Sequence, residues 1–327
     1  MFSIIHGIVV IENGFETVLF IFKNYKEFQM FKNFIEQTIN GLQTGSIYAL
    51  MALGYTMVYG IVKLINFAHG DILMVGAYAA LVAVSNGMPF SLALILSIVF
   101  CSILGVVIDY FAYRPLRNSP RISALITAIG MSFMLESLAL VIFGATPKVI
   151  NTNLLPVFLS PKVKINLGFI SVSMLTIFVI IVTLICMLVL NLFIKNTKLG
   201  KATRAVSQDT GAAKLMGINV NLTIAITFAI GSGLGALGGI MYAIMYPTIE
   251  PYMGMLPGLK AFIAAVFGGI GSIPGAMVGG YVLGIIESYT KGYISSTWAN
   301  PIVFGVLILI LIFKPNGLFG KNMKEKV

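Results

Sequence analysis

Residues 301–313 read PIVFGVLILILIF, an apolar run without a charged side chain. Apolar stretches of similar character and near 20 residues in length recur along the 327-residue chain, which is 58% hydrophobic and only 10% charged. Soluble domains carry about 25% charged residues. Because hydrocarbon offers backbone amides no partner, such stretches cross a membrane as helices. The runs do not alternate as barrel strands would, so the sequence predicts an all-α polytopic membrane protein.

The hydropathy pattern predicts membrane segments at 39–62, 67–85, 90–112, 122–143, 169–194, 222–246, 257–289 and 301–313. Segment 257–289 is too long for one straight span and contains GGIGSIPG at 268–275, so we expect either a hairpin of two short helices or one kinked helix. This predicts eight or nine crossings.

The predicted domain organisation is a single transmembrane domain over residues 34–320, followed by a tail at 321–327. Residues 1–33 are interpreted as an N-terminal extension, because polar residues at positions 12, 13 and 16 interrupt their apolar run. Residues 1–29 are either an unusual extension or a misread start upstream of Met30.

One long polar segment interrupts the membrane pattern. Residues 195–221 read KNTKLGKATRAVSQDTGAAKLMGINVN, with five cations against one acid. Together with loop 113–121 and tail 314–327 this segment carries twelve Lys and Arg, against four in the loops that would face the other side. Because cations collect in cytoplasmic loops, we expect these segments and the C-terminus in the cytoplasm. The same tendency explains the net charge of +10 without nucleic-acid binding.

A short helix is predicted inside this segment. Ser207 can cap its start, Asp209 in its first turn suits the positive end of the helix dipole, and Gly217 suits the residue after its end. The residues between them that would form its body are Ala212, Ala213, Leu215 and Met216. So short a helix needs packing to persist. It either lies on the membrane surface or docks on a soluble partner.

Two apolar segments are broken by polar residues, Gly or Pro: INFAHGD at 65–71 and GGIGSIPG at 268–275. Transporters often place substrate beside such breaks. The candidate pathway or gating residues are Asn66, His69, Asp71, Glu136, Gly271, Pro274 and Gly275. Asn66, His69 and Asp71 could equally cap a helix, and Glu136 could bond a neighbouring helix. We expect Glu287 and Lys291 to form an ordinary helix pair, and Lys260 to extend toward the membrane surface.

Residues 231–239, GSGLGALGG, contain GxGxxG, but the motif lies inside an apolar helix and not after a strand, which argues against a dinucleotide site. Gly231, Gly235 and Gly239 instead predict a close helix-packing seam. No phosphate loop, nucleophile elbow or HExxH motif is present. One His and one Asp near residue 70 are too few for a metal site. The sequence therefore predicts neither enzymatic chemistry nor a metal or cofactor in this chain.

The chain resembles the LivH-type permeases of branched-chain amino acid ABC importers. The resemblance rests on GKATRAVSQDTGAAKLMGINV at 200–220, GLQTGSIYALMALGYTMVYGIVKLINFAHGD at 41–71, RPLR at 114–117, ISALITAIGMS at 122–132 and GLKAFIAAVFGGIGSIPGAMVGG at 258–280. It runs in order from about residue 34 to residue 320.

The resemblance implies a bacterial or archaeal plasma membrane protein that imports Leu, Ile or Val by alternating access. It implies a second permease subunit, two cytosolic subunits that bind and hydrolyse ATP, and an extracytoplasmic substrate-binding protein. The helix near 207–217 would couple the ATPases to the membrane domain. Two alternatives stay open: a permease for urea, amides or other amino acids, and a self-sufficient secondary transporter or channel.

Overall fold

The computed structural model describes residues 14–63, 66–117, 119–151, 154–160, 163–166, 168, 170–314 and 316–320. The predicted tail at 321–327 and the first 13 residues of the predicted extension lie outside the described residues. The long helices are α1 (Gly14–Val62), α2 (His69–Ser85), α3 (Phe90–Ile108), α4 (Arg121–Phe143), α5 (Met174–Asn196), α8 (Val220–Met245), α9 (Met255–Gly268), α10 (Ile273–Tyr293) and α11 (Ala299–Phe313).

Shorter elements join them: α6 (Lys198–Gln208), α7 (Thr210–Leu215), the π-helical turn η1 (Asp109–Tyr113) and the 3₁₀ turns η2 (Arg114–Leu116), η4 (Val157–Leu159) and η5 (Ser296–Trp298). The strands β1 (Lys164–Asn166) and β2 (Ser171–Ser173) pair antiparallel, with Ile165 opposite Val172. This hairpin corrects the predicted segment 169–194, whose helix α5 starts only at Met174, because Ser171–Ser173 are engaged in strand pairing.

Helices α1 and α8 form the centre of the bundle. In the most apolar 18-residue stretch of α1, 83% of residues are buried, and in that of α8, 72% are buried. The corresponding values are 17% for α5 and 11% for the stretch that contains α11. Helix α8 packs against α1, α2 and α3, and α1 packs along α10. The outer helices carry exposed apolar side chains such as Ile126 and Val141 of α4 and Ile308 of α11, the surface that lipid covers.

Within the described residues, six helices are long and apolar enough to cross a membrane. They start in α1, α3, α4, α5, α8 and α11 or the turns that flank them, while α2 and α9 are shorter apolar helices. The chain is thus a multi-pass helical membrane protein. The number of crossings, eight or nine, stays a prediction.

The segment 257–289 is two helices. Helix α9 ends at Gly268 and α10 begins at Ile273, with Gly269 and Gly271 at φ +99° and +92° between them. These backbone angles favour glycine. The two helices lie against each other, so the hairpin form of the prediction is the one observed.

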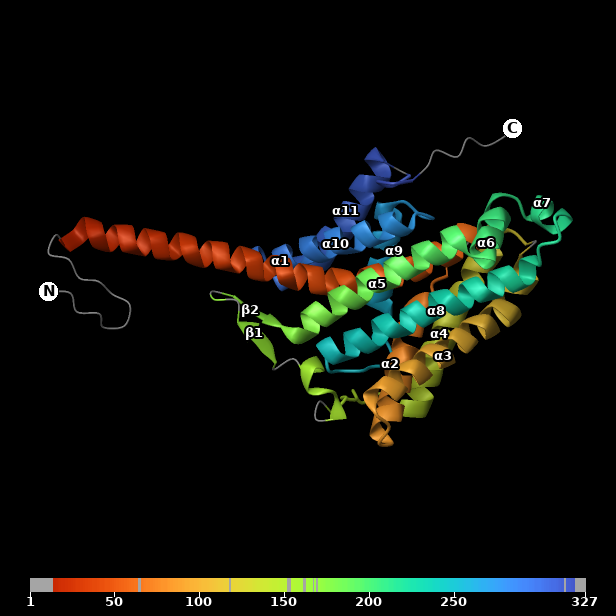
Figure 1. Ribbon diagram of the computed structural model, residues 1–327, viewed down its shortest axis with the longest axis horizontal. Coiled ribbons are helices and arrows are strands. Elements are labelled where there is room, and N and C mark those ends of the chain that lie inside the picture. Colours follow the sequence, from red (N-terminus) through yellow and green to blue (C-terminus); the bar gives the residue numbers. More distant parts are fainter. Residues whose placement is uncertain are drawn as a thin grey trace.

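Figure 1 shows the β1–β2 hairpin at one end of α5 and α6–α7 at the other end. Helix α1 extends beyond the bundle on the side of the hairpin. The predicted boundary between residues 33 and 34 falls inside this continuous helix. The bundle therefore has two distinct ends, one with the hairpin and one with the basic segment.

Candidate functional site

The basic segment folds into two helices. Asp209 caps α7, and its Oδ1 accepts hydrogen bonds from the backbone N–H groups of Gly211 at 2.8 Å and Ala212 at 3.0 Å. Ser207, the predicted cap, lies inside α6 and its hydroxyl donates to the carbonyl of Arg204 at 2.7 Å. The predicted cap was wrong by two residues. The Asp209 carboxylate accepts from two amides and also suits the positive end of the helix.

Gly217 lies just after the end of α7, at φ +79°. Its N–H donates to the carbonyl of Lys214, and the N–H of Ile218 donates to the carbonyl of Ala213, each at 3.0 Å. This pair of bonds is a Schellman motif, which satisfies the last carbonyls of a helix. Helix α7 is therefore held at both ends by its own sequence.

The outer face of α7 is apolar. Leu215 and Met216 are 90% and 82% exposed, whereas Ala213 is buried against the bundle. The same segment carries five exposed cations: Lys195, Lys198, Lys201, Arg204 and Lys214. Helix α6, which contacts α1, α5 and α8, holds α7 at the end of the bundle. The result is an exposed apolar tip on a positively charged segment.

A pocket lies where the two broken segments meet. It is a small cavity lined by Asn66 and His69 from the first break and Ile270 from the second. The other lining residues are Tyr55, Val58, Tyr59, Phe262 and Ala265. The fold thus brings together two interruptions that lie about 200 residues apart in the sequence.

Asn66 and His69 are almost completely buried, at 2% and 1% exposure. The hydroxyl of Tyr113 donates to Asn66 Oδ1 at 2.8 Å, while Asn66 Nδ2 has no hydrogen-bond partner within the part of the chain that the structure describes. His69 Nε2 has no hydrogen-bond partner among the described residues. Each side chain therefore has one buried polar atom without a partner among the described residues.

Asp71 and Glu136 form a separate cluster between α2 and α4. The hydroxyl of Ser132 donates to Asp71 Oδ2, and the Glu136 carboxyl lies within hydrogen-bond reach of Asp71. Both acids are buried. Neither lines the pocket. Glu136 therefore contacts a neighbouring helix, which is one of the two roles expected for it. A role for Asp71 or Glu136 in the transport pathway stays a prediction.

The break between α9 and α10 is stiffened by its neighbours. Ser272 caps α10 and accepts from the N–H of Gly275 at 3.2 Å, and Pro274 lies in the first turn. The backbone of Gly275 lies so close to that of Gly268 that neither position has room for a Cβ. The N–H groups of Leu318 and Phe319 donate to the carbonyls of residues 267 and 268. The C-terminal segment thus covers this break.

Gly231, Gly235 and Gly239 lie on the face of α8 that packs on α1 and α2. A Cβ at Gly231 would be 3.2 Å from the carbonyl oxygen of Gly54, and one at Gly239 would overlap the backbone of Leu73. A Cβ at Gly235 would be 3.3 Å from the imidazole of His69. The glycine seam therefore sets how closely α8 approaches the pocket residues.

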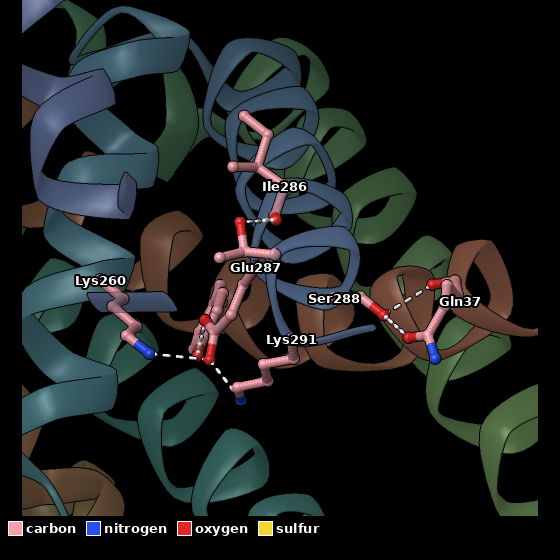
Figure 2. A network of polar contacts seen from close by, with 8 residues as sticks. Gln37, Lys260, Ile286, Glu287, Ser288 and Lys291 are labelled. Carbon is pink, nitrogen blue, oxygen red and sulfur yellow. Dashed lines mark hydrogen bonds and ion pairs between the residues drawn. The ribbon is translucent and has the colours of Figure 1, made fainter. Parts of the chain in front are cut away.

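Sequence analysis missed a buried ionic network, which Figure 2 shows. Glu287 of α10 accepts from Lys260 of α9 at 2.8 Å, from Lys291 at 2.6 Å and from the hydroxyl of Tyr48 of α1 at 2.8 Å. The expected Glu287–Lys291 pair exists, but Lys260 does not extend to the surface: it is only 6% exposed and bonded to Glu287. The signal for this network in the sequence was Glu287, an acid inside an apolar segment. Its partner Lys260 on α9 is brought to it by helix packing. Beside it, Ser288 donates to Gln37 (Figure 2).

Among the residues that the structure describes, no group of three His, Cys, Asp or Glu could hold a metal ion. GxGxxG at 233–238 lies within helix α8 and has no strand before it. The site features are instead those of a membrane transport protein: a bundle with broken helices around a small pocket, and a rigid surface helix at one end.

Comparison with known proteins defines the family. Residues 37–312 match the family described as branched-chain amino acid transport system / permease component, and the chain belongs to it. Its relatives include the permease protein BraD of Pseudomonas aeruginosa, a high-affinity branched-chain amino acid transport system component, at 41% identity over 90% of this chain and 98% of that protein. The corresponding LivH of Escherichia coli is 40% identical over 91% of this chain and 99% of its own length. The protein is a transport permease and not an enzyme.

A probable LivH of Methanocaldococcus jannaschii is 28% identical over 86% of this chain. Among solved structures, PsaBC from Streptococcus pneumoniae in complex with Fab aligns with a TM-score of 0.46 and 12% identity, over 84% of this chain and 90% of that one.

Proposed function

We propose that this chain is the permease subunit of an ATP-driven ABC importer for branched-chain amino acids in a bacterial or archaeal plasma membrane. The substrate is inferred from the relatives, which belong to branched-chain amino acid transport systems. ATP is bound by partner subunits, and this chain carries no cofactor. The C-terminus and the α6–α7 segment face the cytoplasm, in keeping with the positive charge of that end.

The observation that carries the proposal is the exposed apolar tip of α7. Two large apolar side chains at 90% and 82% exposure have no partner within the bundle, although the helix beneath them is capped at both ends. A soluble subunit with a groove would bury this tip, and the five cations of the same segment would favour an acidic surface on that subunit. Two such ATPase subunits, a second permease chain and an extracytoplasmic binding protein complete the proposed transporter.

In this mechanism ATP binding closes the ATPase pair and moves α7 with it. Helices that touch through glycine seams then re-pack and open the central pocket to the other side. Closely packed backbones have few side-chain contacts to break, which keeps the cost of sliding modest. ATP and the binding protein bias the equilibrium only through their different affinities for the two states.

The test is uptake of labelled leucine by proteoliposomes that contain the complete complex, with and without ATP. We expect uptake only with ATP, and we expect the double variant Leu215→Asp, Met216→Asp to retain membrane insertion but lose most ATP-driven uptake. Leu199→Asp, in α6 of the same segment and also exposed, is the matched control and should transport normally.

Uphill uptake by the permease chain alone would favour a self-sufficient transporter over this proposal. Normal ATP-driven uptake by the double variant would remove α7 from the coupling interface. Uptake of urea or amides in preference to leucine would leave the mechanism in place and replace the substrate.

A further inference from the structure

The RPLR motif at 114–117 ends in a cation that joins two distant helices. Nη2 of Arg117 donates to both carboxylate oxygens of Asp109, at 2.6 and 2.8 Å, and Nη1 donates to Oδ1 of Asn221 at 2.6 Å. Asp109 begins the π-helical turn η1 after α3, and Asn221 lies in the first turn of α8. The side chains of Arg117 and Asp109 are only 16% and 3% exposed, so water and salt screen this ion pair weakly. Arg117 therefore fixes the turn after α3 to the start of α8.

The start of α8 is also the place where α7 is attached. Gly217 closes α7, and Asn219 caps α8, its Oδ1 accepting from the N–H of Leu222 at 3.1 Å. Residues 216–219 have little freedom, because both of the helix ends that they join are bonded. Helix α7 also contacts α8 directly. A displacement of α7 therefore moves the first turn of α8 and, with it, Asn221.

Turn η1 reaches the first broken segment on its other side. Tyr113, the last residue of η1, is buried, and its hydroxyl donates to Oδ1 of Asn66 at 2.8 Å. Its ring packs against that of Phe228 of α8, with the ring centroids 5.3 Å apart. The carbonyl of Asn66 accepts from the N–H of His69, the first residue of α2, at 3.1 Å. Turn η1 thus connects α8 to the start of α2.

The backbone of η1 suits a moving part. Its closing bond runs from the N–H of Arg114 to the carbonyl of Asp109, five residues back. Such π-helical turns are rare and occur frequently at functional sites. Asp109 is held through both its backbone and its side chain, since its carboxylate is bonded to Arg117. A shift of Asn221 therefore pulls on Arg117 and, through Asp109, on the whole turn.

We propose that Arg117 is a positioning residue that transmits the movement of α7 to the broken segment at 65–71. The movement enters through Asn221 and leaves through turn η1, whose Tyr113 holds Asn66. This inference rests on the proposed function and adds the route by which movement at one end of the bundle reaches a break inside it. The route is a contiguous series of bonds, so cutting any one of them interrupts it.

The first variant, Asn221→Ala, removes the acceptor on α8 and leaves the Arg117–Asp109 pair in place. Asn221 is exposed, so the fold should tolerate the change. In proteoliposomes that contain the complete complex, we expect the leucine taken up per ATP hydrolysed to fall by about three- to tenfold. This ratio does not depend on the amount of folded protein. Asn86→Ala also removes a hydrogen bond of an exposed asparagine at a helix end and should keep the wild-type ratio.

The second variant, Tyr113→Phe, cuts the route on the other side of Arg117. It removes the hydroxyl that donates to Asn66 and keeps the ring against Phe228. The uptake per ATP should again fall by about three- to tenfold. Tyr110→Phe makes the same change at an exposed position of η1 and should keep the wild-type ratio.

The double variant Asn221→Ala, Tyr113→Phe tests whether the bonds act in series. Independent effects on the ratio multiply, because their free energies add. Two cuts in one route instead lower the ratio no further than the stronger single cut. We therefore expect the double variant to match the more impaired of the two single variants.

A wild-type ratio in either single variant would overturn the route, and so would a loss in the double variant equal to the product of the single losses. If Tyr113→Phe does not reach the membrane, Asn221→Ala decides: a lowered ratio supports the route and a wild-type ratio overturns it. An absence of ATP-driven leucine uptake in the wild-type complex would instead overturn the proposed function.

Discussion

Glu287 is a buried acid bonded to donors from three helices, and its contacts lead to a prediction at the scale of single residues. Lys260 is buried beside it, whereas the side chain of Lys291 is 42% exposed. Removing one partner of a buried ion pair costs about 3–5 kcal/mol, because the other charge is left without compensation. Lys260→Met should therefore lower the Tm of the purified protein strongly, as followed by thermal unfolding in detergent.

Lys291→Met is the matched control for this prediction. A partly exposed ion pair contributes about 0–1 kcal/mol, so its Tm should change little. Adding Glu287→Gln to Lys260→Met should recover part of the lost stability, because the neutral amide no longer leaves a bare charge and still accepts from Tyr48. Equal Tm values for both lysine variants would contradict a buried Lys260.

At the scale of elements, the seam between α2 and α8 depends on glycine. Gly239 has no room for a Cβ because the backbone of Leu73 lies against it. We expect Gly239→Ala to push the two helices apart, with a cost of about 1–3 kcal/mol, as for other overpacked sites. Gly130→Ala in α4, where a Cβ would meet nothing within 4 Å, should be neutral or slightly stabilising through helix propensity. Thermal unfolding of both variants distinguishes the two positions.

The end of α7 gives a second prediction at this scale. Gly217 adopts φ +79°, which asparagine tolerates and a β-branched residue does not. Gly217→Val should disturb the Schellman motif and lower ATP-driven uptake several-fold, while Gly217→Asn should lower it much less. Similar uptake by both variants would show that the geometry of this turn does not matter for coupling.

Ala213→Asp is a poor probe of docking, since Ala213 is buried and its change would disturb packing first.

The whole molecule predicts a topology. The β1–β2 hairpin and α7 lie at opposite ends of the bundle (Figure 1). In a variant with Cys101 and Cys186 changed to serine, Asn166→Cys in β1 should react with a membrane-impermeant maleimide in cells with an opened outer envelope and intact plasma membrane. Lys214→Cys in α7 should react only after that membrane is permeabilised. Labelling of both positions from the same side would contradict the proposed orientation.

What could be predicted from sequence followed from local physics. Apolar runs of sufficient length require helices in hydrocarbon, so class and approximate spans could be predicted from composition alone. Glycine at 217 and the breaks at 65–71 and 268–275 were visible because Gly and Pro act on the backbone where they stand. The start of α7 was misplaced because Ser207 and Asp209 are both good caps; Asp209 accepts from two amides, whereas Ser207 is bonded within α6.

Only the tertiary structure decided which distant groups meet. Lys260 and Glu287 lie on different helices, and no local pattern specifies that their side chains share a bond. The two breaks surround one pocket because α1, α2, α9 and α10 pack at particular depths and rotations. The amino-acid sequence thus determined which segments can lie in a membrane, because hydropathy is a local property. Packing at the glycine seams determined which polar side chains are buried together, because that depends on how closely distant helices approach.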